Sequence, residues 1–417
     1  MSKRVLIVGG GVIGFSVAHY CALKGHQVTV IERGPPERDG CSFANAGMVV
    51  PSHFIPLASP GVIQLALRWM WNPESPFHVQ PRFSSELFDW GWKLYRAATA
   101  ARVAAAATVL RDLHLASRAC FEEWVALWGN EFELVERGLL MLCNTDHGLE
   151  DERRAAEYAQ RLGIPAEVLS PAATAELEPD IRMAIAGAVY YRLDCHLTPG
   201  RLMAVLRREL QGAGVRILHD TKVRAWRASK VHVDAVETSA GPLEADEFVL
   251  CAGIWSKELV RDLGLVLPMQ AGKGYSLTLE APPMRPRICA ILSEARVAMT
   301  PMGESLRFGG TMELAGIDET INPIRIRGIV KSVTRYYPEV RTSHFEQASI
   351  RSGLRPCSPD GLPYVGRFER FANLSTASGH AMMGVSLAPI TGKLMAEVIS
   401  GEPPSCSIAA LRPDRYS

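Results

Sequence analysis

The sequence has almost no net charge, no closely spaced cysteines and no long apolar run. Its 45 Lys and Arg balance 44 Asp and Glu, to a formal net charge of +1. Nucleic acid and an anionic membrane are therefore not expected as main partners. The nine cysteines are dispersed, without a C-x-x-C pair. That pattern indicates a reducing compartment and argues against a redox disulfide.

Signals for secretion and for membrane insertion are also missing. The first apolar segment begins at Arg4, and no basic stretch with a cleavage site precedes it. The longest uncharged stretch, between Arg370 and Lys393, is interrupted by Gly, His and Pro. A span needs about 20 mainly apolar residues. We therefore expect a cytoplasmic protein, with at most peripheral contact with the inner face of the membrane.

A nucleotide-binding pattern occupies residues 5–33. Gly9, Gly11 and Gly14 have G-x-G-x-x-G spacing directly after an apolar strand pattern. The first glycine allows a tight turn, the second lets the backbone approach a pyrophosphate, and the third lets helix and strand pack closely. The next helix presents free N–H groups to that pyrophosphate. Glu32, 18 residues after Gly14, suits the ribose hydroxyls and would repel the 2′-phosphate of NADP.

The rest of the chain predicts an α/β fold with two interleaved domains. A segment rich in proline, 51–81, marks a boundary or lid, and Thr198 with Pro199 opens a helix that runs to Gln211. The following helix, strand and turn patterns are expected: helices at 84–130, 151–162 and 385–400, a strand pair at 134–144 that turns at Gly138, and strands near 215–223, 248–253, 269–314, 348–355 and 374–378.

The crossings between these segments predict the division into domains. The Rossmann-like dinucleotide-binding domain comprises 1–51, 197–267 and 351–417, and the mixed-sheet α+β substrate domain comprises 52–196 and 268–350. Strands near 215–223, 248–253 and 374–378 should join the N-terminal sheet. Segments 132–144 and 269–314 should form the sheet of the substrate domain.

Six segments together resemble the flavin-dependent D-amino-acid dehydrogenase branch of the D-amino-acid oxidase and glycine oxidase superfamily. They occur in family order and span nearly the whole chain. The combination of G-L-R-P, P-D-G and G-H is more specific than the N-terminal glycine pattern. The segments are Ser42–Gly47, Gly272–Thr278, Ala295–Thr300, Arg307–Thr311, Gly353–Gly361 and Ser378–Gly384.

The resemblance implies FAD as the cofactor, and no Cys or His stands out for a covalent link, so we expect FAD to be bound non-covalently. The turn 379–384 precedes a predicted helix, whose dipole could stabilise negative charge on a reduced flavin. No metal is expected. The candidate cofactor residues are Gly9, Gly11, Val12, Ile13, Gly14, Glu32, Arg33, Ser42, Asn45, Ala46, Gly47, Met48, Val223, Cys251, Ala252, Gly253, Gly379, His380, Met383, Gly384 and Val385.

Three residues are candidates for the chemistry. Arg355 ends a strand, and a guanidinium binds a carboxylate through two parallel hydrogen bonds. A surface salt bridge is the alternative, but similar enzymes use this Arg for the substrate carboxylate. Tyr275 could share the carboxylate or place its ring in the core. His380 could touch the flavin or serve as a structural histidine, and His53 could lie on a lid.

The activity implied is oxidative deamination of D-amino acids. Hydride passes from Cα to flavin N5, the imine hydrolyses to a 2-oxo acid, and a quinone or other carrier accepts the electrons. The alternatives are a D-proline or D-hydroxyproline dehydrogenase, an O₂-using oxidase of glycine or sarcosine, a flavin-fold binding protein without turnover, and an NAD-linked dehydrogenase. Chirality, electron acceptor, oligomeric state and general base are left open by the residues alone.

Overall fold

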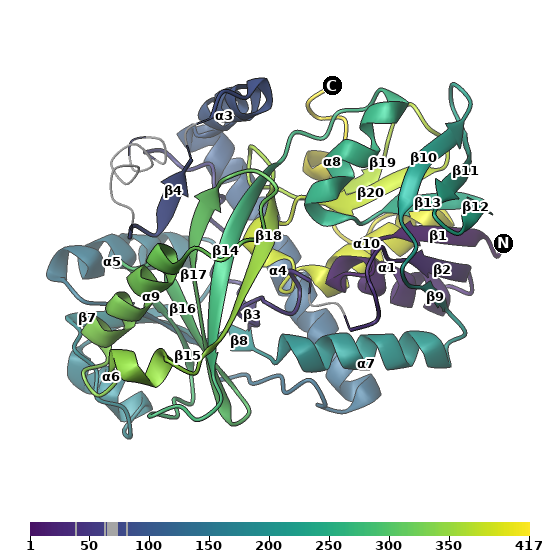
Figure 1. Ribbon diagram of the computed structural model, residues 1–417. Coiled ribbons are helices and arrows are strands. Elements are labelled where there is room, and N and C mark those ends of the chain that lie inside the picture. The colour runs from purple at the N-terminus through teal and green to yellow at the C-terminus, as the bar shows by residue number, and fades with distance from the viewer. Residues whose placement is uncertain (38–39, 62–63, 65–73, 81) are drawn as a thin grey trace.

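The computed structural model describes residues 1–417 except 38–39, 62–63, 65–73 and 81, so those parts of the predicted 51–81 boundary lie outside the described residues. Its mixed α/β fold is built on two large sheets (Figure 1). The first sheet has the strand order β19-β20-β13-β1-β2-β9 and is parallel except for β19. Its strands are β1 (Arg4–Val8), β2 (Gln27–Ile31), β9 (Arg216–Leu218), β13 (Glu247–Leu250), β19 (Tyr364–Arg367) and β20 (Leu374–Ser378).

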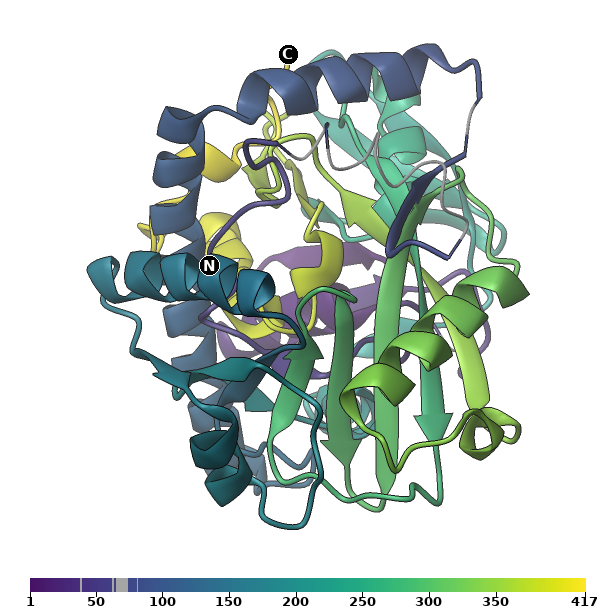
Figure 2. The same ribbon diagram turned by 90° about the vertical axis from the view of Figure 1, so that its left-hand side faces the viewer.

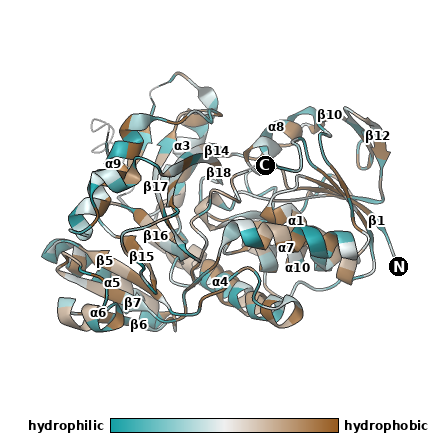
Figure 3. Cartoon of the chain, turned by 60° about the horizontal axis from the view of Figure 1, so that its bottom comes forward, coloured by the Kyte–Doolittle hydropathy of each residue, from teal (hydrophilic) through white to brown (hydrophobic). Residues whose placement is uncertain are grey.

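Both faces of this sheet are covered, which explains why its central strands β1 and β13 are mainly apolar (Figure 3). Residues such as Ile7 and Val30 share a core with α1 (Val12–Leu23), α7 (Pro199–Gly212) and α10 (Ala388–Ser400). Leu6 and Phe248 pack on the other side, against a small sheet of β10 (Val223–Ala228), β11 (Val233–Thr238) and β12 (Gly241–Glu244). Short helices follow β13: η1 (Gly253–Trp255), α8 (Ser256–Leu259) and η2 (Arg261–Leu263).

The second large sheet is mixed and has the order β18-β14-β17-β16-β15-β5-β7-β6, with β4 paired to β17. Helix α9 packs on one face and α5 on strands β5 to β7 (Figure 2). The strands are β4 (Phe77–Val79), β5 (Leu139–Cys143), β6 (Ala166–Leu169), β7 (Gly187–Tyr191), β14 (Gln270–Leu279), β15 (Cys289–Leu292), β16 (Val297–Met302), β17 (Ser305–Leu314) and β18 (Ser349–Cys357). The helices are α5 (Asp146–Arg161), α6 (Pro171–Leu177), α9 (Pro323–Tyr336) and η3 (Thr342–Phe345).

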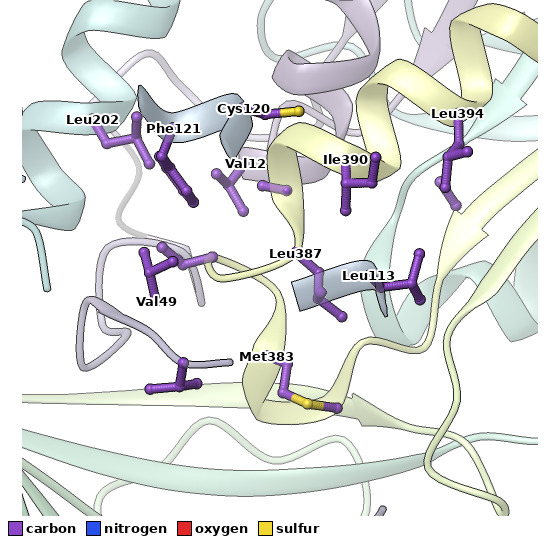
Figure 4. Close-up of a cluster of buried hydrophobic side chains, with 14 of the residues drawn as sticks. Val12, Val49, Leu113, Cys120, Phe121, Leu202, Met383, Leu387, Ile390 and Leu394 are labelled. Carbon is purple, nitrogen blue, oxygen red and sulfur yellow. The ribbon is translucent and has the colours of Figure 1, made fainter. Parts of the chain in front are cut away.

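Helix α4 (Ala100–Trp128) joins the two halves, because its buried face packs on α10 and shares an apolar cluster with Leu139 and Met141 of β5. Figure 4 shows Leu113 and Phe121 of α4 in one apolar cluster with Ile390 of α10 and Val49 of β3 (Met48–Val49). Strand β3 pairs with β8 (Cys195–His196). The remaining elements are α3 (Ser85–Ala97), η4 (Ala381–Met383) and η5 (Ala409–Leu411).

The strand predictions near 215–223, 248–253 and 374–378 are confirmed, since β9, β13 and β20 all lie in the sheet of β1. Segment 269–314 supplies β14 to β17 of the second sheet, as expected. Strand β18 also joins that second sheet, although 351–417 was assigned to the nucleotide domain. The domain division as a whole stays a prediction.

Two local predictions were wrong, and a third is confirmed. Segment 134–138 forms no strand with β5, because Val135 pairs with His196 instead. The predicted start of α7 is confirmed, because Thr198 is its N-cap and Pro199 lies in its first turn, although the Thr198 hydroxyl donates to Glu133 Oε2 (2.6 Å) and makes no capping bond. Helix α10 begins at Ala388 instead of 385, because Pro389 lacks an N–H and is tolerated only in the first turn.

Candidate active site

The predicted glycine turn follows β1, as the sequence indicates. Gly9 has φ +114°, and a Cβ there would lie 2.5 Å from the carbonyl oxygen of Cys251. A Cβ on Gly14 would lie 1.9 Å from the carbonyl oxygen of Gly9. Both positions therefore require glycine, the first for the turn and the second for helix packing. Gly11 is the N-cap of α1, so the free N–H groups of that helix begin beside it.

Glu32 follows β2 and organises the same turn. Its Oε2 accepts the N–H of Gly10 (2.9 Å), and its Oε1 accepts the N–H of Gly34 (3.0 Å). The neighbouring Arg33 places its guanidinium carbon 3.6 Å from the ring centroid of Trp255, a cation–π contact. Sequence reasoning missed Trp255, because nothing local to it reveals a partner that is far away in the sequence.

Gly9, Gly11, Glu32, Arg33 and Trp255 line a first cavity of about 290 Å³. Gly14, Gly47 and Gly379 do not line it and serve packing instead; for example, a Cβ on Gly47 would lie 2.2 Å from the carbonyl oxygen of Leu197. Ala46, Met48 and Met383 line a second cavity. The predicted residues that do line the first cavity are Gly9, Gly11, Val12, Ile13, Glu32, Arg33, Ser42, Asn45, Val223, Cys251, Ala252, Gly253, His380, Gly384 and Val385.

The predicted loop 42–47 lies between the two cavities. Ser42 Oγ accepts the N–H of Val12 (3.0 Å), so it satisfies one free donor at the start of α1. Arg307 on β17 holds the loop through hydrogen bonds from Nη1 to the carbonyl oxygens of Phe43 (2.7 Å) and Asn45 (2.8 Å). The motif 307–311 was recognised, but this anchoring role of its arginine was not.

The second cavity has a volume of about 760 Å³ and meets the first, because Cys41, Asn45 and Ala381 line both. It opens between the second sheet and the segment after β3. Its wall carries Arg355, Tyr275, Arg296, His53, Glu152 and Met383. Two joined cavities, one against a glycine turn and one with the Arg355 guanidinium on its wall, fit an elongated dinucleotide with a substrate beside one end.

Arg355 lies on the edge strand β18, with its guanidinium over the backbone of Gly274 on β14. Its Nη1 donates to the carbonyl oxygen of Thr311 (2.6 Å). Within the described part of the chain, no carboxylate lies within salt-bridge distance of it, so the surface salt bridge considered above is not formed. Burial lowers the pKa of this guanidinium, yet arginine stays protonated. Among the described residues, the cavity wall therefore holds a cation without an anionic partner.

Tyr275 and Lys273 are both engaged on β14. The Tyr275 hydroxyl donates to Glu313 Oε2 (2.7 Å), and burial beside that carboxylate raises the pKa of the phenol. Lys273 is 2% exposed and bonds Asp318 (2.6 Å). The Tyr275 ring lines the second cavity while packing in the core, which combines both readings of this residue. Its proton is committed to Glu313, so donation to a substrate carboxylate would require that bond to break.

His380 has a structural hydrogen bond. Its Nε2 lies 3.0 Å from Thr391 Oγ1 of α10, and burial lowers its pKa to about 3, so the ring is neutral. It also lines the first cavity. The turn after it forms the short helix η4, and α10 starts only at Ala388. The expected long helix directly after Gly384 is therefore not the source of a dipole at that point.

Comparison with known proteins agrees with this arrangement. A family model described as "FAD dependent oxidoreductase" (DAO) matches residues 4–398. A D-amino acid dehydrogenase of Bradyrhizobium diazoefficiens is 32% identical over 99% of both chains, and one of Methylobacterium radiotolerans is 35% identical over 99% of this chain and 100% of its own.

Solved structures are similar over the same length. Glycine oxidase of Geobacillus kaustophilus matches with a TM-score of 0.79 and 25% identity, covering 100% of both chains. The L-proline dehydrogenase of P. horikoshii, at 17% identity and a TM-score of 0.74, shares the fold over 100% of this chain and 98% of its own. The chain therefore belongs to the DAO family of FAD-dependent oxidoreductases.

Proposed function

We propose that the protein oxidises D-amino acids with FAD and passes the electrons to a quinone or another carrier. The observation that carries this proposal is the Arg355 guanidinium, which has no carboxylate partner among the described residues and lies in a cavity that adjoins the glycine turn. Relatives named D-amino acid dehydrogenase, similar over almost their whole length, support the substrate class. The family assignment supports FAD over the NAD-linked and non-redox alternatives.

The first cavity offers what a dinucleotide needs. The Gly9–Gly11 backbone and the N-terminus of α1 suit the pyrophosphate, and Glu32 suits a ribose. Cys41 lines the cavities as an exposed residue, but nothing in its surroundings indicates a covalent link, so we propose non-covalent binding. When bound, FAD supplies the hydride acceptor for the substrate Cα–H.

In the second cavity, the protein contributes binding and orientation. Arg355 is held at Nη1 by Thr311, which fixes the plane of the guanidinium. The rest of the planar group can then receive a carboxylate, and a charge-assisted contact of this kind orients as well as binds. Tyr275 walls the same space with its ring.

A second candidate is an oxidase of glycine or an N-substituted amino acid that uses O₂. The likeness to glycine oxidase, at 25% identity over the whole chain, favours it. Anaerobic bleaching of the yellow protein by a panel of D- and L-amino acids tests the main proposal. Fast bleaching by D-amino acids with slow peroxide formation in air supports a dehydrogenase, whereas fast peroxide formation with glycine or sarcosine supports the second candidate.

For the carrier, we propose that helix α3 contacts a lipid surface that holds a quinone. Phe88, Trp92 and Tyr95 are 70%, 60% and 60% exposed and lie on one stripe of this helix. The opposite stripe, with Trp90 and Leu94, is buried against the protein. Figures 1 and 2 place α3 at the edge of the molecule. An exposed aromatic stripe of this kind is typical of interfacial helices.

The charges around α3 fit an anionic surface. Arg96 and Arg102 are exposed, and Lys93 pairs with Asp89. Glu86 is matched by Lys257 and Arg261. The cations exceed the acids in this patch, so it complements negatively charged head groups. Of the helices in the described residues, none is both long and apolar enough to cross a membrane.

A further inference from the structure

A hydrogen-bonded chain of Asp194, Ser52 and His53 reaches the wall of the second cavity. Asp194 lies between β7 and β8 and is fully buried, with 0% exposure. Its Oδ1 accepts the N–H of Ser52 (3.0 Å), and its Oδ2 accepts the Ser52 hydroxyl. Ser52 Oγ lies 3.1 Å from His53 Nδ1. The proposed function assigns no role to these three residues.

The hydrogen bonds fix the tautomer of His53. A serine hydroxyl has one proton, and Ser52 donates it to the Asp194 carboxylate. Ser52 Oγ must then accept a hydrogen bond from Nδ1–H, so Nε2 is the nitrogen without a proton. Across the described residues, no group bonds this Nε2, and His53 lines the second cavity together with Arg355. A free acceptor nitrogen is therefore available at the wall of the substrate space.

Charged and titratable groups on several elements share the cavity wall with His53 or interact with it electrostatically. Arg296 precedes β16, Asp151 and Glu152 lie on α5, and His114 lies on α4, where Ser386 Oγ is 3.0 Å from its Nδ1. Tyr191 lies at the end of β7.

The surroundings set the proton affinities of the chain. Burial, with Arg296, lowers the pKa of His53 to about 4, so its ring is neutral near pH 7. Burial raises the pKa of Asp194 to about 7. A proton that enters at His53 is therefore held better by Asp194.

We propose that His53, Ser52 and Asp194 form a relay that takes the proton from the ammonium group of the substrate. The N–H bond of the substrate breaks, its electron pair stays on nitrogen, and the proton bonds to His53 Nε2. The Nδ1 proton moves to Ser52 Oγ as the Ser52 proton moves to Asp194. The amine becomes neutral, as oxidation at Cα requires. The Asp194 carboxylate becomes a neutral carboxylic acid, so the charges balance.

This inference rests on the proposed function and adds the base that sequence reasoning did not find. In it, His53 touches the substrate, while Ser52 and Asp194 act through it as positioning and proton-holding residues. The competing reading is structural, because Asp194 also anchors the turn after β3 through the Ser52 N–H. The structural reading predicts changes in stability only, whereas the relay predicts a change in pH dependence.

The test measures the rate of anaerobic flavin reduction by D-amino acids between about pH 5 and pH 10. The variants are Ser52→Ala and Asp194→Asn, with Ser117→Ala as control, since Ser117 is a buried hydroxyl near the same wall that bonds the carbonyl oxygen of Ser386 (2.6 Å). In the parent protein, the second-order rate should rise through about pH 7 as Asp194 ionises. Ser117→Ala should keep this profile.

Both relay variants should lose on the order of 10²-fold in this rate near neutral pH. Their rates should recover only at a pH where the substrate amine itself loses its proton. The pH at which the rate rises should therefore shift with the pKa of the substrate amine when an N-methyl amino acid replaces a primary one. If Asp194→Asn does not fold, Ser52→Ala decides alone.

If the rates of the two variants still rise through about pH 7, or if they fall by the same factor at every pH, the relay is refuted. Absence of flavin reduction by any D-amino acid in the parent protein would instead refute the proposed function.

Discussion

The guanidinium of Arg355 lies against the backbone of Gly274, and a Cβ on that glycine would be 2.1 Å from Nη2. The two residues are on neighbouring strands, β18 and β14, which pair directly. The absence of a side chain at 274 therefore creates the space in which the arginine lies flat beside the cavity. The glycine of the G-K-G motif and the arginine of the G-L-R-P motif form one unit.

Gly274→Ala should displace this guanidinium while the protein still folds, because the obstructing atoms are the end of a flexible side chain. We expect kcat/KM for amino acids to fall on the order of 10-fold or more, with FAD content unchanged. Gly212→Ala on α7, where a Cβ meets open space, is the matched control. Equal kinetics in the two variants would show that the position of Arg355 does not matter.

Glu32→Arg should weaken FAD binding. The change removes the acceptor for the N–H groups of Gly10 and Gly34 and places a cation at the proposed ribose position. A fluorescence titration of the apoprotein should give a raised Kd for FAD. Glu123→Arg, the same charge change on the exposed surface of α4, should leave the Kd as it is. Undiminished affinity in Glu32→Arg would refute the role of this carboxylate.

Acid precipitation tests the mode of flavin attachment. Since we propose non-covalent binding, the yellow colour should appear in the supernatant when the holoenzyme is denatured. Colour retained in the pellet would indicate a covalent bond, and Cys41→Ser would then identify or exclude the exposed thiol.

The α3 surface should bind anionic lipid. Vesicles that contain phosphatidylglycerol should co-sediment the parent protein, and the double change Phe88→Ser and Trp92→Ser should reduce the bound fraction several-fold. Leu127→Ser removes an exposed apolar residue on α4, 64% exposed, and should have no effect. If the stripe instead mediates dimer formation, the parent protein will be a dimer without vesicles and the double variant a monomer.

Local features of the site were predictable from sequence, and long-range ones were not. Gly9, Gly14 and Glu32 lie within one strand–turn–helix–strand unit, so their spacing alone carries the prediction. Helix α10 begins later than predicted because Pro389 has to lie in the first turn, a constraint that is itself local to the sequence. The family motif predicted that Arg355 contacts the substrate. The space above Gly274 that receives its guanidinium could not be predicted, because it depends on the register between β14 and β18.

The proposed relay could not be predicted from sequence either, because it depends on contacts between distant parts of the chain. Ser52 and Asp194 are 142 positions apart, and only the folded chain brings them together. His53 was noticed as a lid candidate, yet its partner could not be inferred from an isolated histidine in a proline-rich segment.

The central claim is that Arg355 binds the substrate carboxylate. Removing this charge-assisted contact is expected to cost roughly 2–5 kcal/mol when the partner charge is left unpaired in a buried site. Arg355→Lys should recover only part of the loss, because an ammonium cannot reproduce the planar fork. Amino-acid amides, which lack the carboxylate, should already be poor substrates of the parent protein. Their kcat/KM should fall less than that of the acids when Arg355 is replaced.

The most direct measurement is kcat/KM of Arg355→Ala for a D-amino acid and for its amide, with flavin content and Tm as checks on folding. The account predicts a fall on the order of 10² or more for the acid, a much smaller fall for the amide, and unchanged flavin content and Tm. Near-normal kinetics with the acid, or equal losses for acid and amide, would contradict it.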